Sequence, residues 1–275
     1  MKRISFATIL LALVFFVGLQ IQATMAIDYL PDGIPYTESS MANLDDDPLL
    51  LNIQQKIDQA FTQAMMVGNS STLDKIHEQL TAAYRSNPHN LIIYWQSYLG
   101  YYKSIFHLQN SDKKAAEKVV NQSVDMLEDM ENPNAEDLAL LALTKSFGIQ
   151  FQSMMMAPIT SGKVKRYAEK ALEMDSTNLR AWYVLASNDF YTPEQYGGMT
   201  KAEGYLLTAI KLPAQQVSNP YLPSWGKDMC FEMLVSYYLK KNQMDKAQQY
   251  YDQAIALYPT NYQLLQLGTQ ISGQE

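Results

Sequence analysis

The sequence feature that most constrains the fold is a two-part pattern in residues 231–261. The first part places apolar side chains at helical spacing, at Phe231, Leu234, Val235 and Tyr238. These positions lie on one face of an α-helix. The period breaks within a few residues of Tyr238, which predicts that the first helix ends there.

The second part of the segment has small residues where the first has large ones. Ala247 and Ala254 stand two helical turns apart, with Tyr251 between them. Small side chains on one face let two helices approach closely. Pro259 follows five residues after Ala254 and cannot continue a helix, so it marks the end. The segment predicts two antiparallel helices joined by a short turn.

The second-helix pattern recurs along the chain, which indicates an internal repeat. An asparagine follows the predicted end of three of these helices and is placed to cap the next helix. These residues are Asn90, Asn178 and Asn261. The recurrences are Ile76, Leu80, Ala83 and Pro88; Val164, Ala168, Ala171 and Ser176; Ala202, Leu206, Ala209 and, one residue early, Pro213; with Ser123 as the corresponding small residue of one further copy.

This order of large, small, aromatic and proline residues resembles the tetratricopeptide repeat, a two-helix hairpin of about 34 residues. Val235 stands where that family usually has glycine, which implies slightly looser packing. The resemblance implies an all-α, right-handed α-solenoid of about five hairpins, with a generic helical bundle as the alternative. The expected hairpins span 48–87, 90–131, 134–175, 178–212 and 225–258, and a last helix from Tyr262 to about Ile271 closes the array.

The copies are longer than the usual repeat, and the extra residues fall in recognisable places. The sequence predicts a long helix from Leu91 to His107, a loop at 157–163, an inserted turn at 191–198 and a linker at 213–224. At the start of the domain, Asp47-Pro48 predicts a capped helix, and Ser71 with Asp74 predicts a capping box.

The N-terminus does not fit the repeat. Lys2 and Arg3 precede an almost wholly apolar run from Ile9 to Val17, and small residues lead to a cut after Ala26. This pattern predicts a signal peptide over residues 1–26, followed by an extended tether over 27–47. A membrane anchor is the alternative, but the run is shorter than the roughly 20 residues a spanning helix needs. We therefore expect an exported protein, periplasmic or extracellular in a bacterial envelope, with no integral membrane span after cleavage.

The charge balance bears on possible partners. The whole chain has a formal net charge of −7, from 21 basic and 28 acidic residues. Cleavage removes Lys2 and Arg3 but no acid, so the mature charge becomes 19 − 28 = −9. Such a protein repels phosphate backbones, which makes nucleic acid an unexpected partner. Cys230 is the single cysteine, so no internal disulfide can form, and we expect it to be a buried thiol.

We find no pattern of residues that carries catalytic chemistry. No pair of ligands has metal-site spacing, no glycine-rich phosphate loop precedes a lysine, and no nucleophile turn is present. Asp45-Asp46-Asp47 lacks the spaced acids of a calcium loop. The sequence therefore predicts no catalytic, cofactor-binding or metal-ligating residue, and we do not expect an enzyme.

The resemblance instead implies a binding surface. In tetratricopeptide arrays the first helix of each hairpin lines a concave groove, so residues off the core stripe of these helices are candidates. The alternative is that the aromatic residues only pack in the core, and Met154–Met156 could likewise be a binding patch or core filling. The candidate groove residues are Tyr94, Tyr101, Tyr183, Ser187, Glu232 and Ser236.

Two functions follow from this interpretation. The leading hypothesis is an exported scaffold that binds a protein or peptide in the concave face of its hairpins. The alternative is a periplasmic small-molecule-binding accessory protein of solute uptake, suggested by the insert Thr192–Gly198. A closed apolar tunnel through the array would support the alternative.

Overall fold

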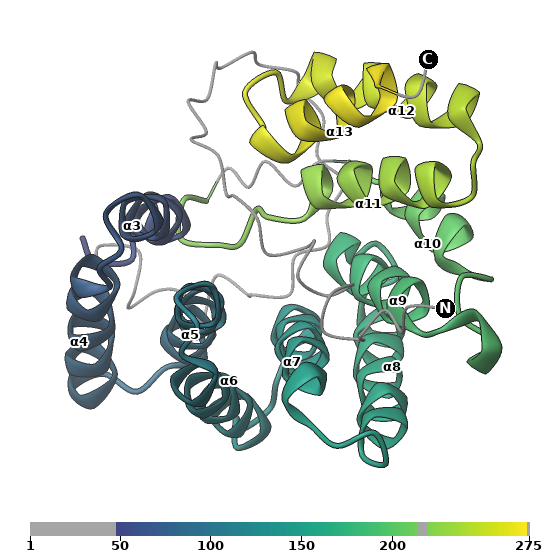
Figure 1. Cartoon of the computed structure of the whole chain (residues 1–275). Coiled ribbons are helices and arrows are strands. Elements are labelled where there is room, and N and C mark those ends of the chain that lie inside the picture. The colour runs from purple at the N-terminus through teal and green to yellow at the C-terminus, as the bar shows by residue number, and fades with distance from the viewer. Residues whose placement is uncertain (1–47, 214–218, 274–275) are drawn as a thin grey trace.

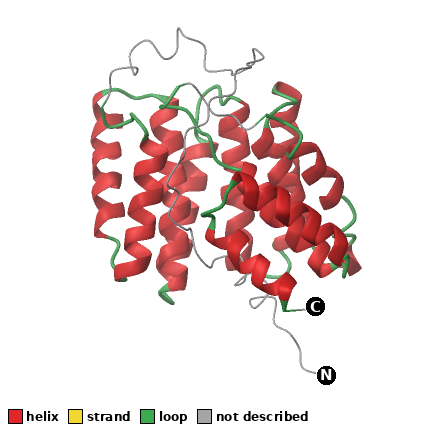
Figure 2. Cartoon of the chain, turned by 90° about the horizontal axis from the view of Figure 1, so that it is seen from above, coloured by secondary structure: helices red, strands yellow, loops and turns green. Residues whose placement is uncertain are grey.

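The computed structural model of this chain describes residues 48–213 and 219–273. The predicted signal peptide and tether lie outside these residues. Within the described part the chain forms eleven α-helices and two short 3₁₀ turns, and no strand (Figure 2). The all-α prediction is confirmed.

The helices pair in chain order, as the repeat predicts. All five predicted hairpins form, and α13 follows them as the expected last helix. The pairs are α3 (Ile53–Val67) with α4 (Ser71–Ser86), α5 (Asn90–Gln109) with α6 (Lys113–Glu128), α7 (Ala135–Gly148) with α8 (Ala157–Met174), α9 (Leu179–Tyr191) with α10 (Ala202–Ala209), and α11 (Lys227–Lys240) with α12 (Met244–Leu257), before α13 (Tyr262–Ser272).

The hairpins follow one another around an arc. Figure 1 shows the first helix of each hairpin, α3, α5, α7, α9 and α11, on the inside of this arc, with α4, α6, α8 and α12 outside it. Consecutive helices pack against each other, and α13 packs on both helices of the last hairpin. We call the surface formed by α3, α5, α7, α9 and α11 the inner face.

Small residues hold the two helices of each hairpin close together, as the pattern predicts. Ala171, Ala209 and Ala254 are fully buried, and Ala83 is half-buried against the core. In the second hairpin the buried residue is Ser123, and the helix opposite carries a glycine at the contact. The alanine spacing therefore reports real helix–helix contacts.

Two of the three predicted asparagine caps are confirmed. The side chain of Asn178 accepts a hydrogen bond from the backbone of Ala181, and Asn261 accepts one from Leu264. The third cap is wrong by one residue. His89 caps α5 through Nδ1, whereas the amide of Asn90 donates to the carbonyl of Glu131.

The start of the first hairpin also differs from the prediction. Residues 48–52 form turns, and α3 begins only at Ile53, after Asn52 with φ of 53°. Asp47 lies outside the described residues. The predicted capping box of Ser71 and Asp74 does not form. Ser71 is already helical, and Ser70 before it makes no side-chain cap but donates its hydroxyl to the carboxylate of Asp74.

The predicted loop at 157–163 is helical instead. Helix α8 begins at Ala157, and Pro158 occupies its first turn. Proline is tolerated there because the first amides of a helix have no intrahelical acceptor. Gly162 is carried within the helix, and the connection from α7 lies at residues 152–156. The proline therefore marks the start of a helix and not an interruption between helices.

The insert at 191–198 is a compact turn between α9 and α10. Its centre is a 3₁₀ turn, Glu194–Tyr196, and Gly197 has φ of 85°. The carboxylate of Asp189 accepts hydrogen bonds from the backbones of Lys201 and Ala202, which fixes the start of α10. This turn connects the two helices of the fourth hairpin.

In the described part of the chain no helix has the length and hydrophobicity that a bilayer crossing requires. Cys230 is fully buried, and burial raises the pKa of its thiol. Met154, Met155 and Met156 lie at the surface between α7 and α8, so the expectation that they fill the core is wrong.

Candidate binding site on the inner face

The linker before α11 runs back across the inside of the array. In Figure 1 this light-green segment reaches α3 before it enters α11. The backbone amide of Asn52 donates to the carbonyl of Pro220 (3.0 Å), and the indole of Trp95 donates to the carbonyl of Tyr221 (3.0 Å). Residues 219–226 therefore cover part of the inner face at α3 and α5.

Trp225 is the anchor of this linker. Its indole donates to the hydroxyl of Tyr94 (2.8 Å), and its ring lies 6.1 Å from that of Tyr98 and 6.5 Å from that of Tyr183. Its carbonyl accepts a hydrogen bond from Arg180 (2.9 Å). Trp225 thereby joins α5 to α9 and is only 5% exposed.

A buried ion pair lies behind Trp225. The guanidinium of Arg180 donates twice to the carboxylate of Glu136, and both residues are almost completely buried. Asn178 donates a further hydrogen bond to the same carboxylate (2.9 Å), and Arg180 lies over the Trp225 ring at 5.5 Å. Buried charges are tolerated when they are paired and hydrogen-bonded in this way.

This packing overturns one predicted groove residue. Tyr94 has no exposed surface, and its hydroxyl is occupied by Trp225. Burial raises the pKa of Tyr94, as expected for a phenol in the core. The prediction failed because the residue that covers Tyr94 comes from the linker, 131 residues away in sequence. Tyr94 is therefore a core residue and offers no surface to a ligand.

Helix α9 carries a polar row on its inner face. Tyr183, Ser187 and Tyr191 follow at four-residue spacing, and neither Tyr183 (4% exposed) nor Ser187 (8%) has much accessible surface. None of the three hydroxyls has a hydrogen bond within the described residues. Every fully shielded side-chain N or O in that part of the chain has a partner, so these hydroxyls reach accessible surface.

The neighbouring inner helix, α11, carries a matching row. Asp228, Glu232 and Ser236 are also four residues apart. The amide of Asn261, at the start of α13, donates to Glu232 (2.7 Å) and lies 3.4 Å from a carboxylate oxygen of Asp228. The hydroxyl of Ser236 donates to the carbonyl of Glu232. The two carboxylates are thus held side by side.

The acids of the inner face are destabilised in their charged forms. Burial, and then the neighbouring Asp228, raise the pKa of Glu232 to about 8. The same two causes raise the pKa of Asp58, on α3, to about 7, although Tyr98 donates a hydrogen bond to it. No described lysine or arginine forms an ion pair with Glu232 or Asp58. These carboxyls therefore lack a compensating cation.

Two basic residues of adjacent segments, Arg180 and Lys227, are engaged elsewhere. Arg180 is committed to Glu136. The ammonium group of Lys227 donates to carbonyls at the end of α10, including those of Ile210 and Leu212. Cations favour this position because a helix C-terminus carries partial negative charge.

Tyr101 completes the cluster from α5. It is half-buried, its ring lies 5.3 Å from that of Phe147, and burial raises its pKa to about 12. Tyr101 and Glu232 both lie close enough to raise the pKa values of Tyr183 and Tyr191. We call Tyr101, Tyr183, Ser187, Tyr191 and Glu232 the inner-face site.

Several of the predicted groove residues lie near one another in the structure. The structure brings Tyr101, Tyr183 and Glu232 together, with Ser187 and Ser236 in the same helix rows. The sequence-based prediction did not include Asp58, Asp228 and Tyr191. The spacing of four residues that linked the predicted pairs also points to Asp228 and Tyr191. Nothing in the sequence shows that Asp58 lies near enough to Asp228 for that acid to raise its pKa, because the two residues come from the first and last hairpins.

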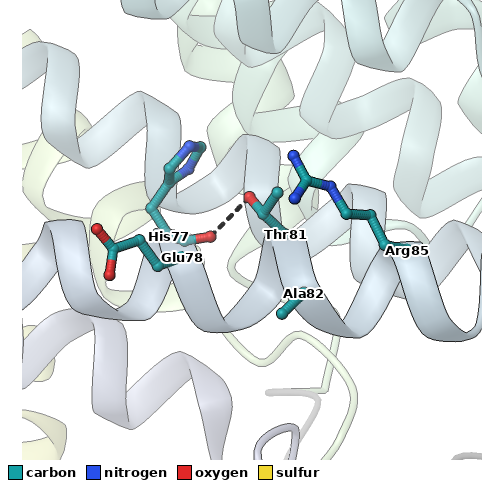
Figure 3. A pocket seen from close by; sticks show the side chains of 5 residues that line it. All are labelled: His77, Glu78, Thr81, Ala82 and Arg85. Carbon is teal, nitrogen blue, oxygen red and sulfur yellow. Dashed lines mark hydrogen bonds between the residues drawn. The ribbon is translucent and has the colours of Figure 1, made fainter.

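Two shallow hollows of the described surface lie away from this site. One follows α4, where His77, Thr81 and Arg85 stand in a row and the Thr81 hydroxyl donates to the carbonyl of His77 (2.8 Å) (Figure 3). The other lies between α12 and α13. Neither is the apolar tunnel that the solute-uptake hypothesis needs. No cluster of three metal-ligating side chains occurs in the described residues.

Comparisons with known proteins bear on the fold. No protein-family model matches the sequence. No curated protein sequence matches it either. Among solved structures, it resembles TTC0263, a thermophilic TPR protein of Thermus thermophilus, with a TM-score of 0.51 and 13% identity over 79% of this chain and 97% of that one.

A second solved structure is more distant. YrrB, described as a TPR protein with an unusual peptide-binding site, matches with a TM-score of 0.35 and 13% identity. The alignment covers 86% of this chain and 98% of that one, but so low a TM-score supports no conclusion. The likeness to TTC0263 agrees with the five hairpins: the chain is TPR-like and has a solenoid-like fold of helical repeats.

Proposed function

We propose that this protein is an exported scaffold that binds a protein or peptide segment on the inner face of its helical array. The observation that carries the proposal is the pair of polar rows on α9 and α11. The hydroxyls of Tyr183, Ser187 and Tyr191 on α9 have no hydrogen bond within the described residues and keep accessible surface, and the carboxyl of Glu232 on α11 accepts only the amide of Asn261. Scaffolds of stacked hairpins use their inner surface for binding because it is extended and rigid.

The position of the linker indicates which part of the inner face is left for such a segment. Residues 219–226 already lie along α3 and α5 much as an extended peptide would, with backbone carbonyls bonded to Asn52 and Trp95. The hydroxyls of Tyr183, Ser187 and Tyr191 on α9 have no hydrogen bond within the described residues. We therefore place the binding segment at α9 and α11.

A selection from a random peptide library tests this function. We expect the purified protein to enrich a family of related sequences. Replacing Ser236 by arginine, on the inner row of α11, should abolish their binding, because a long side chain would fill the site. The matched control is Gln122→Arg on the exposed side of α6, which should bind as the wild type does. Failure to enrich any peptide with folded protein would refute the proposal.

Export is a separate element of the proposal, and it rests on the N-terminal sequence alone. Expression of the full chain in a bacterial host, followed by N-terminal sequencing of the envelope fraction, tests it. We expect the mature protein to begin at Ile27. Retention of residues 1–26 in the cytoplasmic fraction would contradict export while leaving the binding proposal intact.

A further inference from the structure

We infer that the inner-face site binds the positively charged side chain of a lysine or arginine in the partner segment. This inference rests on the proposed function and adds the chemistry of recognition. It depends on two observations: the nearly buried hydroxyl of Tyr183, which has no hydrogen bond within the described residues, and the carboxyl of Glu232, which forms no ion pair there.

The first observation is the hydroxyl of Tyr183. The residue is only 4% exposed, yet its hydroxyl has no hydrogen bond within the described residues. A polar group left in such a place costs free energy unless it finds a partner. The hydroxyl keeps accessible surface, helices α9 and α11 pack together, and Tyr101, Tyr191 and Glu232 lie close enough to raise the pKa of Tyr183. A ligand that reaches these groups can therefore bond to the hydroxyl.

The second observation is the charge of the surroundings. Glu232 accepts only a neutral amide hydrogen bond, from Asn261, and burial with the nearby Asp228 raises its pKa to about 8. The carboxyl is therefore largely protonated near neutral pH, and a cation that binds beside it stabilises its ionised form. Arg180 and Lys227, the cations of adjacent segments, are held by Glu136 and by the end of α10. A cation that enters the site therefore meets attraction that no internal charge cancels.

The hydrogen-bonding groups of the site fit the same ligand. An ammonium or guanidinium group has several N–H donors and no acceptor. The carboxylate of Glu232 and the hydroxyls of Tyr101, Tyr183 and Tyr191 can all accept. Aromatic rings attract cations through their faces, so the tyrosines also discriminate against an anionic side chain.

The experiment uses the peptide selection on the whole protein. We expect every enriched family to carry lysine or arginine at one fixed position. In a synthetic peptide of that sequence, replacing this residue by glutamine should weaken binding roughly tenfold or more, as loss of a charge-assisted hydrogen bond does. Glu232→Gln should remove most of this difference, whereas the matched control Glu173→Gln, on the exposed side of α8, should keep it.

A second variant separates recognition from folding. Tyr183→Phe keeps the ring and removes only the hydroxyl, and we expect a weaker affinity for the basic peptide at an unchanged melting temperature. Enrichment of peptides without a fixed basic residue, or an undiminished preference in Glu232→Gln, would overturn the inference while the proposed function stands. Free arginine amide that competes as well as the peptide would assign the site to a small cation and also overturn it. No enrichment at all would instead refute the proposed function.

Discussion

Trp225 donates its indole N–H to the hydroxyl of Tyr94 at 2.8 Å, across 131 residues of sequence. This bond joins the linker of the fifth hairpin to the first helix of the second. In an ideal solenoid each repeat contacts only its neighbours. Here one tryptophan couples repeats that are far apart in the chain.

The Trp225–Tyr94 contact should contribute measurably to stability. Trp225→Ala removes a nearly buried indole and should lower the free energy of unfolding by about 3–5 kcal/mol. In a double-mutant cycle, Trp225→Phe and Tyr94→Phe should show a coupling of about 1 kcal/mol, the value of one buried hydrogen bond. Urea unfolding measures all four proteins. Strictly additive effects would show that the hydrogen bond contributes nothing.

Removing one partner of the buried ion pair should destabilise the protein more than removing both partners. Glu136→Gln leaves the guanidinium of Arg180 buried without its counter-charge and should destabilise the protein by about 3–5 kcal/mol. Combining it with Arg180→Met removes the stranded charge and should recover part of this loss. Thermal unfolding followed by circular dichroism gives the comparison. A double variant less stable than Glu136→Gln would contradict the account.

Stability should fall as the pH rises through the range in which the inner-face acids ionise. Glu232 and Asp58 have raised folded-state pKa values, of about 8 and about 7, against ordinary values of 4.5 and 3.8. Between these limits the unfolded chain has lost these protons while the folded chain still holds them. Raising the pH therefore favours unfolding, and the effect ends above about pH 8.

The matched variants for this pH dependence are Glu232→Gln and Asp58→Asn, which cannot ionise. Each should flatten the decline between pH 5 and pH 8.5 by on the order of 1 kcal/mol or more. Urea unfolding at a series of pH values supplies the measurement. If both variants kept the full slope of the wild type, the decline would have to come from other groups.

The contact between α5 and α6 should not tolerate a larger residue at its closest point. A Cβ on Gly100 would lie 2.0 Å from the hydroxyl oxygen of Ser123, so Gly100→Ala should cost about 1–3 kcal/mol. Adding Ser123→Gly frees the space and should restore part of the loss. Gly148→Ala, where a Cβ meets nothing within 4 Å, is the matched control and should be nearly neutral.

How much the sequence could predict depends on the range of the contacts involved. The hairpins were predictable because Ala171, Ala209 and Ala254 make their contacts within one repeat, where spacing alone fixes the geometry. The loop predicted around Pro158 was wrong because proline at the first turn of a helix and proline in a loop look alike in sequence. Local patterns therefore gave the architecture but left some boundaries open.

The inner face was harder to predict because its residues come from distant repeats. Helix periodicity correctly grouped Tyr183 with Ser187 and Glu232 with Ser236. It could not show that Trp225 would cover Tyr94, or that Asp228 would lie near enough to raise the pKa of Asp58. Both depend on how far the arc curves, and that curvature accumulates from small rotations at every repeat junction.

The linker at 219–226 has a consequence for how this array can change in size. Open-ended repeat proteins gain or lose units without disturbing the rest. Here the linker before the fifth hairpin is hydrogen-bonded to Asn52 and Trp95 and has a fixed length. Inserting one more hairpin between the second and fourth would break the linker's contacts with Asn52 and Trp95. A single extended segment therefore restricts the number of repeats.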